Sequence, residues 1–313
     1  MDTQDLGVIK SLYNPNMARV FGVTTSVRFP RLDRRWNHWR KVKREDRRLR
    51  EAIRLGRRPV IVYSHPKTAS RSVEQALHEL PNVEVFHTHV LRPRHFTTKF
   101  EPVTSILAGG MVQHSEPTQW PLHKLLADSS VEYTTISLVR DPVATTVSWL
   151  YFGIQRWLRS WRKIDPTMLS DNEWMQVFQS HFPQFGVWAW WDHEFIPVTQ
   201  IRPHVDGFDS ERGWSIYDRG RFKSMILSTH LDDGCKAEAL SSLMGLSVPR
   251  VGRANQSSER AGRAQYERVQ RLIAQHTEFR TALLESSWAE LFFKAKQRAD
   301  FECRWAEVAN ANH

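Results

Sequence analysis

A lysine and several hydroxyl side chains follow an apolar run from Val60 to Tyr63, and this run is typical of a buried strand. The polar segment contains Pro66, Lys67, Thr68, Ala69, Ser70, Arg71 and Ser72. Beyond it, apolar residues recur at the spacing of one helix face, at Val73, Ala76, Leu77 and Leu80. Backbone N–H groups at a helix start, an ammonium group and hydroxyl donors together favour an anion. The sequence therefore predicts a phosphate-binding turn between a strand and a helix.

This turn differs from the Walker A loop of ATPases and kinases. The pattern G-x-x-x-x-G-K-[ST] is absent, and Lys67 precedes the other turn residues instead of following a second glycine. No evident Mg²⁺-binding carboxylate lies near Lys67 in the sequence. A nucleotide-dependent phosphotransferase is therefore a disfavoured alternative. A capped strand-to-helix connection that binds no ligand is a second alternative.

A second strand, turn and helix are predicted about seventy residues later. The β-branched and apolar run from Tyr133 to Val139 ends at Arg140. Asp141 is a suitable N-cap and Pro142 suits the first position of a helix. Arg140 is then expected at the carboxyl end of a strand, where open α/β sheets bind ligands, with Ser148 two turns into the helix. The alternative is a surface ion pair that caps a helix.

Two histidines lie near the end of a third predicted strand, from Val83 to Val90. The two-residue period of a strand places His87 and His89 on the same face. The chain has fourteen His, but its two Cys, Cys235 and Cys303, are isolated. No metal-ligand spacing is evident, so no metal site is predicted. A hydrogen-bonded packing role is the alternative for each of these histidines.

The two predicted phosphate sites resemble those of sulfotransferases that use 3′-phosphoadenosine-5′-phosphosulfate (PAPS). The Lys67 turn resembles their 5′-phosphosulfate loop, particularly that of the glycosaminoglycan uronyl 2-O-sulfotransferases. The Arg-Asp-Pro segment that begins at Arg140, with Ser148, resembles their 3′-phosphate motif. In these enzymes a His-x-His after the second strand supplies the base, which the resemblance assigns to His89. Many relatives carry a second arginine near the position of Thr145, and this chain does not.

The resemblance implies an α/β fold with a P-loop-like, mostly parallel central sheet flanked by helices. It also implies in-line transfer of a sulfuryl group from PAPS to a hydroxyl, without a metal. Lys67 then stabilises the departing phosphate oxygen, and His89 takes the proton of the attacking hydroxyl. The residues expected to bind the nucleotide are Pro66, Lys67, Thr68, Ala69, Ser70, Arg71, Ser72, Arg140 and Ser148.

Aromatic residues are concentrated between Trp149 and Trp191, which holds seven of the thirteen Trp. We interpret most of them as structural, because clustered Trp more often fill a core than bind sugars. On the acceptor side we expect His87, Trp191 and Glu194 to contribute. Glu194 is also the second candidate for the base, and the alternative for it is a helix-surface carboxylate paired with an arginine.

Later segments extend the resemblance to the bacterial putative capsular polysaccharide synthesis family, which is itself sulfotransferase-like. These segments are Trp191 to Glu194, Val205 to Asp209, Gly213 to Tyr217, Tyr266 and the final aromatic helix. The similarity spans about Val60 to Trp305 and implies a saccharide or polysaccharide acceptor.

The composition is that of an ordinary globular protein, with 313 residues, 41% hydrophobic and 25% charged. We expect a sulfotransferase domain over 59–313, with helical acceptor-binding insertions around 150–215. The residues Trp288, Leu291, Phe292 and Ala295 predict a C-terminal helix.

No apolar stretch approaches the roughly 18 residues of a spanning helix, and the first thirty residues lack the apolar core of a secretory signal. A cytoplasmic protein without disulfides is therefore expected.

Positive charge is concentrated in one segment. The net charge is +10, and the segment from Arg31 to Arg58 has thirteen Arg or Lys and four Asp or Glu, which gives +9. Residues 1–58 are thus predicted to be a basic extension that is helical in part, with a partial helical stripe of Trp36, Trp39, Leu49 and Ile53. A solvated charged helix is one interpretation, and a collar for an anionic glycan or nucleotide is the other. A noncatalytic binder of anionic polymers is a further alternative, whereas nucleic acid is not expected as a partner.

Overall fold

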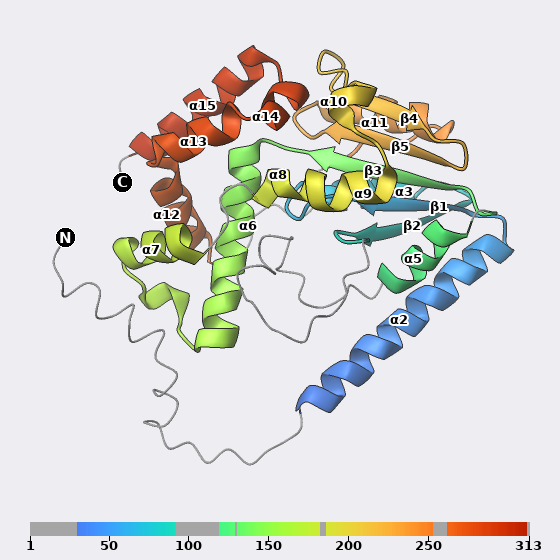
Figure 1. Cartoon of the computed structure of the whole chain (residues 1–313), viewed down its shortest axis with the longest axis horizontal. Helices are drawn as coiled ribbons and strands as arrows, with labels where there is room; N and C mark the ends of the chain where they lie inside the picture. Colours follow the sequence, from blue (N-terminus) through green and yellow to red (C-terminus); the bar gives the residue numbers. More distant parts are fainter. Residues whose placement is uncertain (1–29, 92–118, 129, 182–185, 253–261, 312–313) are drawn as a thin grey trace.

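The computed structural model describes residues 30–91, 119–128, 130–181, 186–252 and 262–311. It confirms the predicted α/β class, with a five-stranded sheet in the order β2-β1-β3-β5-β4 (Figure 1). Four strands are parallel, and β4 runs antiparallel to β5. The strands are β1 (Arg58–Tyr63), β2 (Val83–Thr88), β3 (Tyr133–Val139), β4 (Trp214–Asp218) and β5 (Phe222–Ser228).

The sheet has two buried faces because alternate residues of its strands point to opposite sides. In β1, Val60 and Val62 join one apolar cluster, whereas Ile61 and Tyr63 join the other. Every residue of β3 is buried, as expected for a central parallel strand covered on both faces. Near-continuous apolar runs such as Tyr133–Val139 therefore identify central strands in this sequence.

Two helices cover the first face. They are α3 (Ser70–His78) and α11 (Asp233–Met244), and both contribute buried side chains to the cluster with Val60 and Val62. The apolar residues that predicted α3 are all buried there, including Leu77 with no exposed surface. The periodicity of α3 thus reflects its contact with the sheet.

The second face carries a larger set of helices, some of which Figure 1 shows in front of the sheet and others below it or to its left. They include α2 (Pro30–Arg54), α5 (Gln119–Ala127), α6 (Pro142–Trp157) and α8 (Gly186–Trp190), followed by the π-helical turn η4 (Trp191–Phe195) and α9 (Ile196–Thr199). Between α6 and α8 lie η2 (Leu158–Arg162), η3 (Pro166–Met168) and α7 (Asp171–His181), and α10 (Pro203–Asp206) precedes β4. The described residues from 142 to 206 are mainly helical.

The C-terminal part is helical, as predicted, and forms four helices. They are α12 (Arg263–Ala274), α13 (Thr277–Leu284), α14 (Ser287–Phe292) and α15 (Ala295–Asn310). Phe293 and Lys294 have extended backbones and separate the last two helices. Phe293 is buried, and its ring centroid lies 5.2 Å from that of Phe301. The helix is interrupted where this side chain packs into the core.

The order of the strands creates a ligand-binding position. From β1 the chain moves outward to β2, then crosses back over β1 to form β3 on its other side. The carboxyl ends of β1 and β3 therefore border the point where the winding direction reverses, and open α/β sheets bind ligands in the crevice at such a point. The Lys67 turn follows β1, and Arg140 follows β3.

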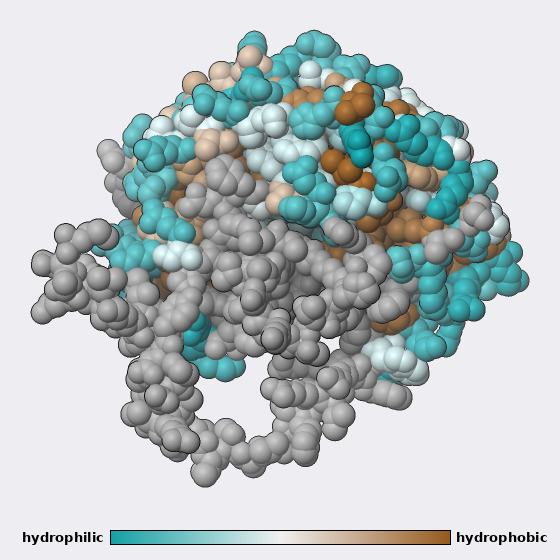
Figure 2. All heavy atoms as spheres, in the orientation of Figure 1, coloured by the Kyte–Doolittle hydropathy of each residue, from teal (hydrophilic) through white to brown (hydrophobic). Residues whose placement is uncertain are grey.

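The predicted helical part of the basic extension is α2, while residues 1–29 lie outside the described residues. Arg48 bonds to Glu84 and to the carbonyl of Val85, so α2 runs opposite to β1 and β2 along the molecule's edge (Figure 1). Where described residues are exposed in Figure 2, the surface is mostly hydrophilic with smaller apolar patches. Among the described residues, no helix has the length and apolar character needed to cross a bilayer.

Candidate functional site

The turn after β1 has an unusual backbone for residues with side chains. Lys67 and Ala69 have φ angles of 72° and 61°, in the left-handed region that favours glycine. Thr68 holds the turn from inside, because its hydroxyl contacts Ser64 Oγ at 3.0 Å and donates to the His65 carbonyl at 2.8 Å. Left-handed residues between right-handed ones turn successive N–H groups toward one concavity, which suits an anion. The strained conformation at the head of α3 is therefore consistent with the predicted phosphate-binding turn.

Arg140 joins the two predicted phosphate sites. Its Nη1 donates to the carbonyl oxygen of Lys67 at 3.0 Å. The two turns are therefore in contact across the ends of β1 and β3, and a single bound molecule can touch both. Asp141 is the N-cap of α6, as predicted, and its Oδ1 accepts from the N–H groups of Val143 and Ala144 at 2.9 and 3.1 Å.

The last helix reaches the same position, which no local sequence pattern predicted. Arg304 of α15 pairs with Asp141 Oδ2, and Trp305 Nε1 donates to the same oxygen at 2.9 Å. Thr145, on the first turn of α6, is fully buried. The tertiary structure thus brings a second guanidinium, that of Arg304, to the end of β3.

Tyr266 of α12 lies beside the other predicted nucleotide residues. It interacts with Ser148 on α6 through a side-chain hydrogen bond, and it lies close enough to Arg140 for an electrostatic interaction. Burial raises the pKa of the Tyr266 phenol, and the charge of Arg140 partly offsets this rise. Ser148 itself is 9% exposed, so access to it depends on the space beside Tyr266.

The side chain of Lys67 points toward α6. Its ammonium nitrogen lies 3.4 Å from the ring centroid of Phe152, within the range of a cation–π contact. This contact holds the charge between the turn and the first helix after β3. The other turn residues differ in exposure: Pro66, Thr68 and Ser70 are buried, whereas Ala69 and Arg71 are exposed.

His87 connects β2 to the head of α3. Its Nε2 lies 2.8 Å from Ser70 Oγ, and its Nδ1 lies 3.6 Å from Glu74 Oε2. Burial, together with the nearby charges of His89 and Arg71, lowers the pKa of His87 to about 3. In a neutral ring, Nδ1–H points toward the carboxylate, and Nε2 accepts a hydrogen bond from the Ser70 hydroxyl. His87 therefore contacts the predicted phosphate-binding turn itself.

His89 lies directly after β2, and its ring centroid is 4.7 Å from that of His87. The proximity confirms that the two histidines share a face. His89 Nδ1 donates to the Ser64 carbonyl at 2.7 Å, because a carbonyl can only accept. Trp190 Nε1 in turn donates to the His89 carbonyl at 2.9 Å. This tautomer leaves Nε2 of His89 with the lone pair that a general base requires.

Glu194 is buried, in contrast to the surface carboxylate considered as its alternative. It is 2% exposed, and its Oε1 accepts from the Tyr63 hydroxyl at 3.1 Å and from the Leu91 N–H at 2.5 Å. These bonds link η4 to the end of β1 and to the segment just after His89. These contacts indicate that Glu194 holds that segment in place.

Trp191 is placed in the core, although we expected it on the acceptor side. It is 1% exposed and lies against Trp190, Phe195, Trp288 and Phe292. A ring enclosed in this way offers no face to a sugar. Trp149, Trp174, Trp188 and Trp190 are buried too, which confirms the interpretation that most of these Trp are structural.

Sequence reasoning missed His65, which precedes the turn. The ring is fully buried, its Nδ1 donates to the Pro66 carbonyl at 2.7 Å, and burial lowers its pKa to about 3. The ring lies edge-on to Trp149, with 5.5 Å between centroids. Its position beside the Lys67 turn, directly after an apolar strand, was the only signal in the sequence.

Comparisons with protein-family models, curated proteins and solved structures found no match. The assignment of the site therefore rests on the geometry of this chain. That geometry brings together Lys67, Ser70, His87, His89 and Arg140 at one edge of the sheet.

Proposed function

We propose that this protein transfers a sulfuryl group from PAPS to a hydroxyl of a saccharide acceptor. The observation that carries the proposal is the 3.0 Å contact from Arg140 to the Lys67 carbonyl at the point where the sheet reverses its winding. A nucleotide with phosphates at both its 5′ and 3′ positions needs two anion sites close enough for one molecule to reach both. The Lys67 turn would take the 5′-phosphosulfate, and Arg140 with Ser148 the 3′-phosphate.

The reaction is an in-line displacement at sulfur. The acceptor oxygen forms a new bond to sulfur while the bond from sulfur to the bridging phosphate oxygen breaks, and both of its electrons remain on that phosphate. His89 Nε2 takes the hydroxyl proton, and the ammonium of Lys67 stabilises the charge on the departing phosphate. Most of the rate enhancement would come from positioning and electrostatic stabilisation, as in phosphoryl transfer.

Two features of the residues support these roles. The Ser64 carbonyl fixes His89 in the tautomer with a basic Nε2. The ammonium nitrogen of Lys67 is 3.4 Å from the centroid of the Phe152 ring, which places the charge beside the turn. A side chain that exchanges a cation–π contact for a phosphate gains a charge-assisted hydrogen bond.

Calorimetry with 3′-phosphoadenosine-5′-phosphate in the presence of EDTA tests the proposal. We expect saturable binding, and we expect Arg140→Ala to weaken it by about tenfold or more, because a charge-assisted phosphate contact is lost. Arg219→Ala is the matched control, since Arg219 pairs with Asp206 at the turn between β4 and β5. That variant should bind as the unchanged protein does.

Two outcomes would contradict the proposal. Binding of ATP that requires Mg²⁺, without binding of the bisphosphate nucleotide, would identify a phosphotransferase. No nucleotide binding at all would exclude a nucleotide-dependent transferase. Once binding is established, transfer from labelled PAPS to a panel of saccharides identifies the acceptor.

A further inference from the structure

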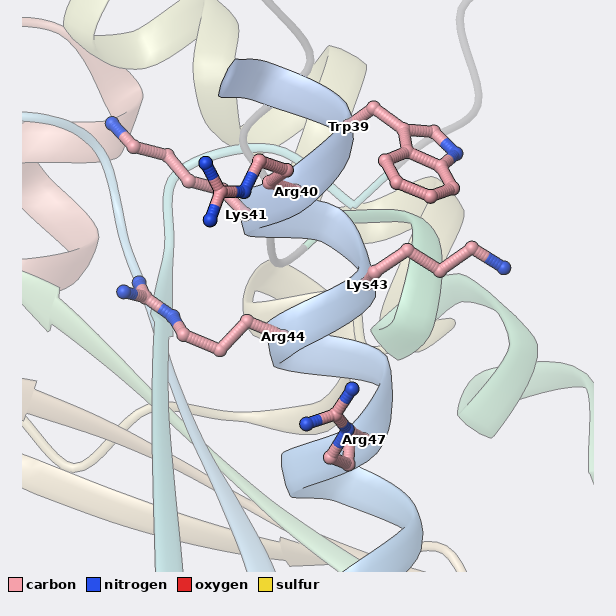
Figure 3. A pocket seen from close by; sticks show the side chains of 6 residues that line it. All are labelled: Trp39, Arg40, Lys41, Lys43, Arg44 and Arg47. Carbon is pink, nitrogen blue, oxygen red and sulfur yellow. The ribbon is translucent and has the colours of Figure 1, made fainter. Parts of the chain in front are cut away.

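The outward side of α2 carries cations that the rest of the described protein does not neutralise. A hollow of about 740 Å³ lies along the middle of α2 and is lined by Trp39, Arg40, Lys41, Lys43, Arg44 and Arg47, and we call these six residues the basic face (Figure 3). Among the described residues, Arg40, Lys41 and Arg47 form no ion pair or hydrogen bond. Lys43 lies 5.6 Å from the ring centroid of Trp39.

The last two turns of α2 are different, because their arginines are paired. Arg48 bonds to Glu45 and Glu84, Arg50 to Asp46, and Arg54 to Glu51. Leu49 and Ala52 are buried, so this part of the helix is attached to the protein. Among the described side chains of α2, the unpaired arginines therefore precede this attached part.

Exposed apolar side chains accompany these cations. Trp39 and Ile53 are 49% and 40% exposed. They are fourteen residues apart, close to four turns, so they lie on the same side of the helix, with Lys43 and Arg50 between them. Figure 3 shows Trp39 and Lys43 leaving α2 on one side and Lys41 and Arg44 on the other, with Arg40 and Arg47 between. The result is a wide, outward surface of cations flanked by an indole.

We propose that the basic face of α2 docks the protein onto an anionic phospholipid membrane. A soluble linear polyanion would need only the cations, whereas an exposed Trp beside Lys is the pairing that lipid headgroup regions favour. Arginine and lysine supply attraction to anionic lipids, and Trp39 enters the interface between headgroups and acyl chains. Leu49 and Ala52 of α2 are already buried against the protein, so the helix lies on the membrane without inserting its buried side.

The consequence is peripheral and salt-dependent attachment. Because α2 runs opposite to β1 and β2, the basic face precedes the attached part of α2 in the direction of the carboxyl ends of these strands (Figure 1). His89 follows β2 at that end of the sheet. A docked molecule would hold that end of the sheet near the membrane. The proposal does not depend on the proposed sulfuryl transfer, and nucleotide calorimetry does not report on it.

Co-sedimentation of the full chain with vesicles tests this proposal. We expect binding to vesicles of phosphatidylcholine mixed with phosphatidylglycerol, little binding to phosphatidylcholine alone, and loss of binding at high salt. The triple variant Arg40→Gln, Lys41→Gln and Arg47→Gln should weaken binding by about a hundredfold, at roughly tenfold or less per cation. A control with the same change in net charge is Arg219→Gln, Lys223→Gln and Arg250→Gln, which alters exposed cations elsewhere and should bind nearly unchanged.

A second variant separates a membrane from a soluble polyanion. Trp39→Ala should weaken vesicle binding several-fold while leaving retention on a heparin column and binding to RNA unchanged. Thermal unfolding of each variant reports on folding, since all the altered residues are exposed. Equal binding to neutral and anionic vesicles, equal loss in the two triple variants, or binding to the soluble polyanions without binding to vesicles would each overturn the proposal.

Discussion

At the scale of single residues, the orientation of His89 decides whether it can act as a base. Its Nδ1–H is held by the Ser64 carbonyl, and its own carbonyl accepts from Trp190. The bond to Ser64 thus holds the ring through Nδ1, and the bond from Trp190 holds the backbone of the same residue. The neighbouring His87 is neutral and bonded to Ser70, so it contacts the predicted phosphate-binding turn.

We expect His89→Ala to reduce sulfuryl transfer by about a hundredfold or more, because general base catalysis contributes at least that factor. Nucleotide affinity should stay nearly unchanged. His78→Ala is the matched control, since His78 is exposed at the end of α3. The measurement is steady-state transfer from PAPS together with nucleotide calorimetry.

Glu194→Ala distinguishes the two candidates for the base. Because Glu194 anchors Leu91 and Tyr63, its removal should lower thermal stability, and Glu194→Gln should restore much of that stability through the amide oxygen. If Glu194→Gln lost transfer while remaining stable, and His89→Ala kept its rate, the assignment of the base would be reversed.

At the scale of elements, the junction of β3 and α6 is connected to the C-terminal helices. Asp141 caps α6 through Val143 and Ala144 and also receives Arg304 and Trp305 from α15. A single carboxylate thus couples a strand end, a helix start and the last helix. Because it adjoins Arg140, a change in this junction reaches the predicted 3′-phosphate site.

Asp141→Ala should destabilise the protein more than the loss of an ordinary cap. Asp232→Ala is the comparison, because Asp232 caps α11 on the exposed surface by accepting from Cys235 N–H at 2.8 Å. We expect a loss of about 1 kcal/mol for Asp232→Ala. For Asp141→Ala we expect about 2–4 kcal/mol, since the buried Trp305 N–H also loses its acceptor. Urea unfolding measures both, and equal losses would contradict the coupling.

At the scale of the whole molecule, two buried histidines tie stability to pH. The pKa values of His65 and His87 are lowered to about 3 by burial, with smaller contributions from nearby charges. An unfolded histidine titrates near 6.5. Between these values the unfolded state binds more protons than the folded state, so acidification favours unfolding.

The free energy of unfolding should therefore be highest above pH 6.5 and should fall as the pH decreases from 6.5 toward 3. Each histidine contributes up to about 1.4 kcal/mol per pH unit in this range. Urea denaturation between pH 7.5 and about 4.5 measures the slope in a window above the usual titration of carboxylates. His87→Gln should reduce the slope by about half, and a flat profile would contradict the burial of both rings.

The sequence was sufficient for the elements whose residues contact one another locally. The runs at Val60 and Tyr133, the periodicity of α3 and the cap at Asp141 all predicted their elements. The C-terminal part is helical as predicted, but the pattern from Trp288 to Ala295 is interrupted at the buried Phe293. Trp191 and Glu194 were placed in the core by contacts with distant segments, which periodicity does not reveal.

The sequence by itself determined the α/β class and the turns that follow β1 and β3, because strand and helix periods, caps and turn residues act over a few positions. Only the tertiary structure decided that Arg140 contacts the Lys67 turn and that Arg304, near the other end of the chain, pairs with Asp141. It also decided which nitrogen of His89 carries the proton. Those features depend on strand order and on hydrogen bonds between residues far apart in sequence, which the local pattern does not specify.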